Sequence, residues 1–124
     1  MNVVSWFEIP VKDLGRARAF YTEVLGHALG DLPSPIPGME MVAFPFEPNA
    51  PHASGALVKA EGRSPRADSV YVYFQCGDDL ATELGRVEAA GGKIVMPKTS
   101  IGPWGFIAHV LDTEGNRIGL ASQQ

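Results

Sequence analysis

Side chains that could do chemistry occupy matching places in two similar segments, WFEIPV and YVYFQC. Glu8 follows Trp6 by two residues in the first segment, and Tyr73 follows Tyr71 by two in the second. Side chains two residues apart in a strand share a face, so each pair would lie together. Desolvation raises the pKa of a carboxyl group and suits it to proton transfer. We therefore expect Glu8 to be a catalytic acid/base; the alternative is a structural acid held by Tyr73 or an arginine.

The aromatic side chains of these segments form a second candidate group. Trp6, Tyr71 and Tyr73 would make a wall for a flat or apolar ligand, with the two phenol groups as hydrogen-bond donors. Large aromatic residues also fill ordinary protein interiors. The sequence leaves substrate binding and plain packing both open for this group.

His109 is the histidine best placed for chemistry. It lies in the apolar segment FIAHVLD, where strand alternation puts it on one face with Ile107 and Leu111. It is a candidate catalytic base, or a metal ligand acting together with Glu8. A structural histidine, satisfied by neighbours within the fold, is the alternative.

Two further side chains are candidates for substrate binding. Arg117 alternates with Gly119 and Ala121, so it could attract an anionic substrate, unless it lies at the surface beside the preceding turn. Trp104 lies in the loop segment GPWG, where its indole would gate a site or form a subunit contact. Cys76 falls on the opposite, helix-facing side of its strand and is expected to be an inert core thiol.

The elements that position these residues come from a chain that repeats itself after about 65 residues. Each of the two matching strands runs directly into a helical pattern. Asp13 is a natural N-cap for the first helix, and Gly26 supplies a left-handed stop. In the second helix, Asp79 is the predicted N-cap and the Gly91-Gly92 pair the predicted stop.

Short strands complete each half. We expect strands at 39–46, 56–60, 93–96, 107–111 and 117–121, loops at 30–38 and 47–51, and a turn at 112–116. The resulting order is β-α-β-β-β twice, with one later strand of the first half unassigned. The fold class is therefore α+β.

Composition limits the classes of protein that this chain can belong to. Its 124 residues suffice for one domain with a hydrophobic core, and 14 Gly with 10 Pro indicate many short elements. A net charge of −4 argues against nucleic-acid or anionic-membrane partners. The single cysteine excludes an intrachain disulfide and suits the cytoplasm. No signal peptide or stretch long enough to span a bilayer is expected.

Two motifs carry a resemblance to a known family. EIPVKDLGRARAFYTEVLG and the closing DTEGNRIGL resemble the vicinal oxygen chelate superfamily, which includes glyoxalase I, fosfomycin-resistance enzymes, extradiol dioxygenases and bleomycin-binding proteins. WFEIPVKDL with MPKTSIGPWGFIAHVLDTEGNRIGL is similar to the small glyoxalase-related bacterial proteins. The resemblance implies a single domain over 1–124 whose two βαβββ modules, at about 1–60 and 69–124 with a linker at 61–68, curl into a cupped mixed sheet. It also implies a homodimer.

The metal ligands of that superfamily do not carry over to this chain. The positions of its two histidines fall on Trp6 and Tyr71, and that of its glutamate falls on Gly119. Indole has no lone pair to offer, a neutral phenol is a poor ligand, and glycine has no side chain. We therefore expect neither the usual metal site nor any other cofactor.

Three functions are consistent with these residues. The first is a metal-independent lyase or isomerase that binds a small organic molecule in the cup, with Glu8 as acid/base. The second is a non-catalytic, antibiotic-like binding protein. The third is a metalloenzyme with a relocated site that uses Glu8 and His109.

Overall fold

The computed structural model describes residues 3–34, 36–47 and 53–124. The first module contains β1 (Trp6–Pro10), α1 (Leu14–Leu25), β2 (Gly30–Leu32), β3 (Met39–Ala43) and β4 (Ser54–Ala60). The second contains β5 (Tyr73–Gln75), α2 (Ala81–Leu84), β6 (Lys93–Ser100), the 3-10 turn η1 (Gly102–Trp104), β7 (Phe106–Leu111) and β8 (Arg117–Ser122). The expected α+β architecture of two βαβββ modules is confirmed.

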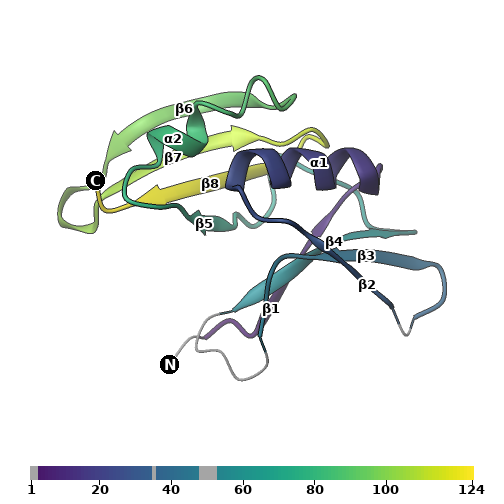
Figure 1. Cartoon of the computed structure of the whole chain (residues 1–124). Helices are drawn as coiled ribbons and strands as arrows, with labels where there is room; N and C mark the ends of the chain where they lie inside the picture. Colours follow the sequence, from purple (N-terminus) through teal and green to yellow (C-terminus); the bar gives the residue numbers. More distant parts are fainter. Residues whose placement is uncertain (1–2, 35, 48–52) are drawn as a thin grey trace.

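Each module folds into one mixed four-stranded sheet (Figure 1). Sheet A has the strand order β1-β4-β3-β2, and sheet B has the equivalent order β5-β8-β7-β6. In both sheets the first strand of the module runs parallel to its last strand, and the other neighbours are antiparallel. Equivalent positions therefore have equivalent neighbours: Glu8 lies beside Ala56 in sheet A, and Tyr73 lies beside Gly119 in sheet B.

Both sheets turn one face toward a shared hydrophobic core next to α1 (Figure 1). Leu57 of sheet A and Leu120 of sheet B belong to the same buried cluster. The ring of Tyr21 in α1 contacts Phe44 from the first module and Phe74 from the second, at centroid distances of 5.5 and 5.7 Å. Because the core takes one face of each sheet, the other faces lie on the outside of the chain. We call these the outer faces.

A buried polar network fixes the two modules to each other. The Tyr21 hydroxyl donates to Asp112 Oδ2 at 2.6 Å. Asp112 Oδ1 in turn accepts hydrogen bonds from the backbone N–H groups of Glu114 and Asn116. Asn116 Nδ2 donates to the backbone carbonyl of Pro10 at 2.8 Å. The β7–β8 turn is thereby joined to both α1 and the end of β1.

The first helix agrees with its sequence signals, and the second is shorter than predicted. Asp13 Oδ1 accepts from the backbone N–H of Arg16 at 2.9 Å, and Gly26 ends α1 with a φ of 76°. In the second module only Ala81–Leu84 is α-helical, and residues 85–91 form hydrogen-bonded turns. The predicted helix up to Gly91-Gly92 was therefore wrong in length. Gly85, in the middle of the predicted segment, lowers the helical propensity there.

The loop predicted at 30–38 was wrong for its first three residues, which form β2. This strand pairs with β3, with Gly30 opposite Ala43 and Leu32 opposite Met41. Three residues are too few to show an alternating pattern, so the pairing partner determines the structure. Residues 48–51 of the loop expected at 47–51 lie outside the described residues.

Prolines explain the two strands whose observed ends differ most from the predicted ones. β3 stops at Ala43 instead of 46, just before the Phe44-Pro45 step, because proline has no N–H for the sheet ladder. β6 continues from the predicted end at 96 to Ser100, since register shifts on both sides of Met96 accommodate Pro97. The remaining strand ends agree with the predictions within two residues. No helix in the described ranges is long and apolar enough to cross a bilayer.

Candidate functional site

Four of the residues singled out from the sequence meet on the outer face of sheet B. Tyr71, Tyr73, His109 and Arg117 form what we call the module-two cluster. Register pairing places Tyr73 beside Gly119 and Gly119 beside His109. The Tyr73 hydroxyl lies 2.7 Å from His109 Nε2, and Arg117 Nε–H donates to His109 Nδ1 at 2.9 Å. The strand alternation predicted for His109 is confirmed, because Ala108 and Val110 on either side are fully buried in the core.

Aromatic and charged contacts complete the cluster. The Tyr71 ring meets the His109 ring edge-on at a centroid distance of 5.2 Å, and the Arg117 guanidinium lies over Tyr71 at 5.4 Å. The two tyrosines are 40% and 46% exposed, whereas His109 beneath them is 7% exposed. Burial lowers the pKa of His109, and the Arg117 charge lowers it further. The imidazole is therefore neutral at pH 7.

Gly119, which aligns with the metal-binding glutamate of the superfamily, is in close contact with the Tyr73 ring. The Tyr73 ring lies directly on Gly119, where an added Cβ would be 2.2 Å from Tyr73 Cδ1. Glycine at 119 is required for this close approach. In the described parts of the chain, no three His, Cys, Asp or Glu side chains are grouped so as to hold a metal ion. The residues present thus do not fit the usual metal of this fold.

Glu8 and Trp6 lie on the other sheet, on the outer face of sheet A. The Glu8 carboxylate forms an ion pair with Arg63 and accepts a hydrogen bond from Trp6 Nε1 at 3.4 Å. Its side chain is 27% exposed. The Trp6 ring packs edge-on against Phe46 at 5.6 Å. The sequence suggested either an arginine or Tyr73 as the partner of a structural Glu8, and in the structure the partner is an arginine.

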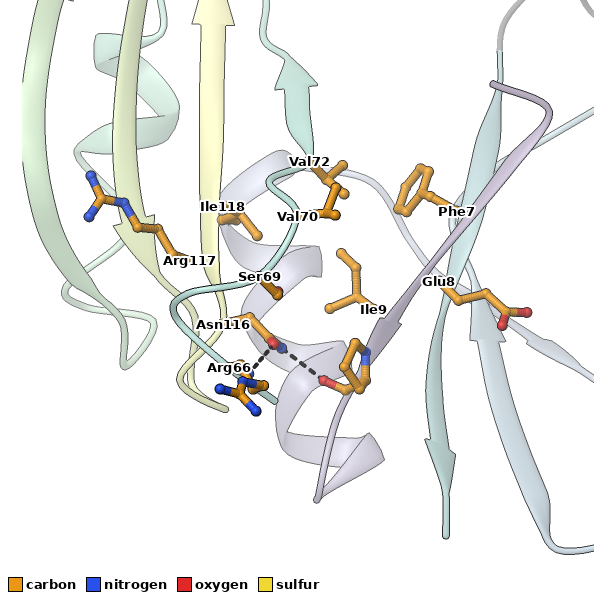
Figure 2. Close-up of a pocket in the computed structure, with 11 residues that line it drawn as sticks. Phe7, Glu8, Ile9, Arg66, Ser69, Val70, Val72, Asn116, Arg117 and Ile118 are labelled. Carbon is orange, nitrogen blue, oxygen red and sulfur yellow. Dashed lines mark hydrogen bonds between the residues drawn. The ribbon is translucent and has the colours of Figure 1, made fainter. Parts of the chain in front are cut away.

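The two outer faces point away from each other within one chain. Figure 2 shows Glu8 and Arg117 directed to opposite sides, while Phe7 and Ile9 point toward the space between the modules. A site that combines Glu8 with His109 is therefore not assembled within a single chain. Trp104 projects from η1 and is strongly exposed.

Cys76 lies in the core, as predicted. Burial raises the pKa of its thiol to about 12, with a further contribution from the nearby charge of Glu83. The thiol form therefore dominates at neutral pH, which makes this residue a poor nucleophile.

A cavity of about 230 Å³ lies between the modules, on the inner side of β1 (Figure 2). Val70, Val72 and Ile9 contribute apolar side chains to it. At one end Asn116 accepts from the Arg66 backbone N–H and donates to the Pro10 carbonyl. Arg117 of the module-two cluster also lines this cavity, whereas the Tyr73–His109 pair does not, so the cavity adjoins the cluster without including that pair.

Sequence reasoning missed Arg63 and Phe46 as members of the face that carries Glu8. Arg63 is separated from Glu8 by 55 residues, and only the parallel pairing of β1 with β4 brings the end of β4 close to it. Phe46 lies beyond β3 and reaches Trp6 through the same sheet. No local spacing could have signalled either contact.

Comparison with known proteins places this chain in a family. The family model of the Glyoxalase/Bleomycin resistance protein/Dioxygenase superfamily matches residues 3–120. The chain belongs to this superfamily, which confirms the resemblance seen in the sequence motifs.

Individual relatives are distant. CFP32 of Mycobacterium bovis, which is described as a candidate glyoxylase, is 24% identical to this chain over 116 residues. That match covers 94% of this chain and 44% of CFP32, so the chain spans less than half the length of this relative. TnmS3 of Streptomyces sp. CB03234, described as an antibiotic binding protein, is 26% identical with a TM-score of 0.65, covering 100% of this chain and 98% of TnmS3. A glyoxalase-related enzyme from Fulvimarina pelagi is 18% identical with a TM-score of 0.69, covering 98% and 88% of the two chains.

Proposed function

We propose that the protein binds a small, flat organic molecule against the module-two cluster. The observation that carries this proposal is the pair of exposed rings, Tyr71 and Tyr73, held beside the Arg117 cation by a buried neutral histidine. Aromatic faces next to fixed polar groups are typical of small-molecule sites. The antibiotic-binding relative TnmS3 is similar over almost its whole length and supports the same class of function.

We further propose that the protein is a homodimer in which the cup is formed between two copies. The outer faces of sheets A and B lie on opposite sides of one chain, so Trp6 and Glu8 do not face the cluster within that chain. In a two-fold dimer, the Trp6–Glu8 face of one copy covers the cluster of the other. Sedimentation equilibrium at micromolar concentration should give twice the chain mass, and a monomer that still binds ligand would contradict this arrangement.

The single reduced, buried Cys76 is in keeping with a cytoplasmic location.

The binding proposal is tested by a thermal-shift screen of aromatic antibiotics and metabolites. A ligand at 100 times its Kd stabilises the folded state by about 2.7 kcal/mol, which raises the Tm of a chain this size by about 10 °C. We expect Tyr71→Ala to abolish the shift given by any hit. Val95→Ala removes a similarly exposed apolar side chain outside the cluster and should leave the shift unchanged. Equal loss in both variants, or no hit across the screen, would count against the proposal.

A metal-independent lyase or isomerase with Glu8 as acid/base is the second candidate. Its support is that the Glu8 carboxylate is partly exposed on an outer face beside Trp6. Each binding hit should be incubated with the protein and analysed for product by mass spectrometry. Glu8→Gln keeps the shape of the side chain and removes the charge, so a product formed at the wild-type rate would exclude the acid/base role. A hit that binds without any product favours sequestration.

A further inference from the structure

The hydrogen bonds around His109 determine where its proton lies. A guanidinium has only donors, so the bond from Arg117 Nε at 2.9 Å requires Nδ1 to be an acceptor without a proton. A neutral imidazole then carries its proton on Nε2, and Nε2 faces the Tyr73 hydroxyl at 2.7 Å. His109 therefore donates to the Tyr73 oxygen.

The same constraint leaves the hydroxyl hydrogen of Tyr73 free. The only hydrogen bond of its hydroxyl within the described ranges is the one with His109, in which its oxygen accepts. The side chain is 46% exposed, and its ring is fixed by contact with Gly119. A phenol held in this way directs a hydrogen-bond donor away from the sheet, toward whatever occupies the outer face.

We infer that Arg117 and His109 are positioning residues that make Tyr73 a hydrogen-bond donor for a carbonyl oxygen of a flat aromatic ligand. This inference rests on the proposed binding function and names the ligand class for that site. The exposed Tyr71 and Tyr73 rings provide the surface for the flat part of the ligand. The Arg117 charge beside them favours an electron-rich oxygen over a cation.

His109 has a different role here from the base or metal ligand considered from the sequence. One ring nitrogen accepts from Arg117 and the other donates to Tyr73, so neither lone pair is free for a substrate proton or a metal. The groups facing the imidazole are Arg117 from β8, Tyr71 and Tyr73 from the β5 side, and Met96 opposite it on β6. None of these groups from the same chain is a carboxylate that would favour the charged form.

The first test needs no ligand. Imidazole ¹⁵N NMR of the full chain reports the protonation of each ring nitrogen, with the His109 signals assigned by their loss in His109→Gln. We expect a protonated Nε2 and an unprotonated Nδ1 at pH 7. In Arg117→Met the pKa of His109 should rise, because a neighbouring cation is removed. Arg66→Met removes an arginine paired with Asp68 instead and should leave His109 unchanged. A wild-type His109 with its proton on Nδ1 would overturn the inference.

The second test compares two flat probes that differ by one carbonyl group, 9-fluorenone and fluorene. A hydrogen bond to the carbonyl should make 9-fluorenone bind about 3- to 10-fold more tightly. Tyr73→Phe keeps the ring and should reduce this ratio to about 1. Tyr71→Phe removes the other phenol hydroxyl of the cluster, which has no bond to His109, and should preserve the ratio.

The outcomes separate the inference from the proposed function. Equal binding of the two probes by the wild-type protein would refute the donor role of Tyr73 while leaving the binding function intact. Binding of neither probe would contradict the proposed function for flat aromatic ligands, and the NMR result would still decide the roles of Arg117 and His109.

Discussion

Substitution of Gly119 by alanine perturbs the cluster at a single point. The new Cβ would lie 2.2 Å from Tyr73 Cδ1, whereas non-bonded carbons prefer about 3.5–4.0 Å. The ring must therefore move outward by more than 1 Å (roughly the difference between these distances), and the hydroxyl at its far end moves further. The 2.7 Å contact with His109 Nε2 cannot survive this displacement.

The free energy of unfolding should change little, because Tyr73 is half-exposed and its ring can swing into solvent. Overpacking costs about 1–3 kcal/mol, and replacing glycine within a strand recovers about 0.5–1 kcal/mol of backbone entropy. We therefore expect the free energy of unfolding, measured with urea, to fall by about 0–2.5 kcal/mol, together with at least a 10-fold loss of affinity for any ligand of the cluster.

Imidazole NMR and ligand titration of the same preparation measure the two effects. The Nε2 signal of His109 should shift as the bond to Tyr73 is lost. Gly30→Ala is the matched control, since Gly30 also lies in a strand and an added Cβ there meets no atom within 4 Å. A Gly119→Ala protein with unchanged His109 signals and unimpaired binding would refute the packing argument.

Three further predictions concern stability and metal content. Burial alone would raise the pKa of Glu114, but hydrogen bonds from Arg16 and from the backbone N–H groups of Asp13 and Lys12 lower it from 4.5 to about 2. The stability that this group provides is present above pH 4.5 and lost as the pH falls toward about 2. Because Arg16 is half-exposed, solvent weakens its ion pair with Glu114. We therefore expect Glu114→Gln to lower the free energy of unfolding at pH 7 by about 1–3 kcal/mol, measured with urea, and to make this free energy fall less steeply at acid pH. Tyr21→Phe removes the shorter of the two hydrogen bonds that Oδ2 of buried Asp112 accepts and leaves the one from Asn116 Nδ2 at 3.1 Å. It should lower the free energy of unfolding by about 1–3 kcal/mol, measured in the same way; no change would mean that the network does not join the modules. Protein purified without chelators should contain no stoichiometric Mn, Fe, Ni or Zn by elemental analysis, and one bound ion per chain would contradict the conclusion that Trp6, Tyr71 and Gly119 do not fit a metal.

The fold was predictable from the sequence because its signals are local and occur twice. The Asp13 cap, the Gly26 stop and the alternation of β1 each depend on a few neighbouring residues. β2 and the shortened α2 were not predictable in this way. The first is defined by its pairing with β3, and the second by a glycine within an otherwise helical pattern.

The site was predictable in its residue types but not in its grouping. Alternation placed Tyr73 on the cup-lining face of its strand and His109 on the face opposite Ala108 and Val110, and the two meet because β8 lies between their strands. The same reasoning put Glu8 beside these tyrosines, since the two modules were expected to share one cup. The core packs the modules so that their outer faces diverge, and this arrangement depends on contacts such as Tyr21 with Phe44 and Phe74, between residues distant in sequence.

Chemical-shift mapping of a bound ligand tests the central claim most directly. Titration of ¹⁵N-labelled protein with 9-fluorenone, or with a hit from the thermal-shift screen, should perturb the amides around Tyr73, His109 and Gly119 on the outer face of sheet B. Perturbations confined to the inner cavity around Val70, Val72 and Ile9 would place the binding site elsewhere and contradict the account.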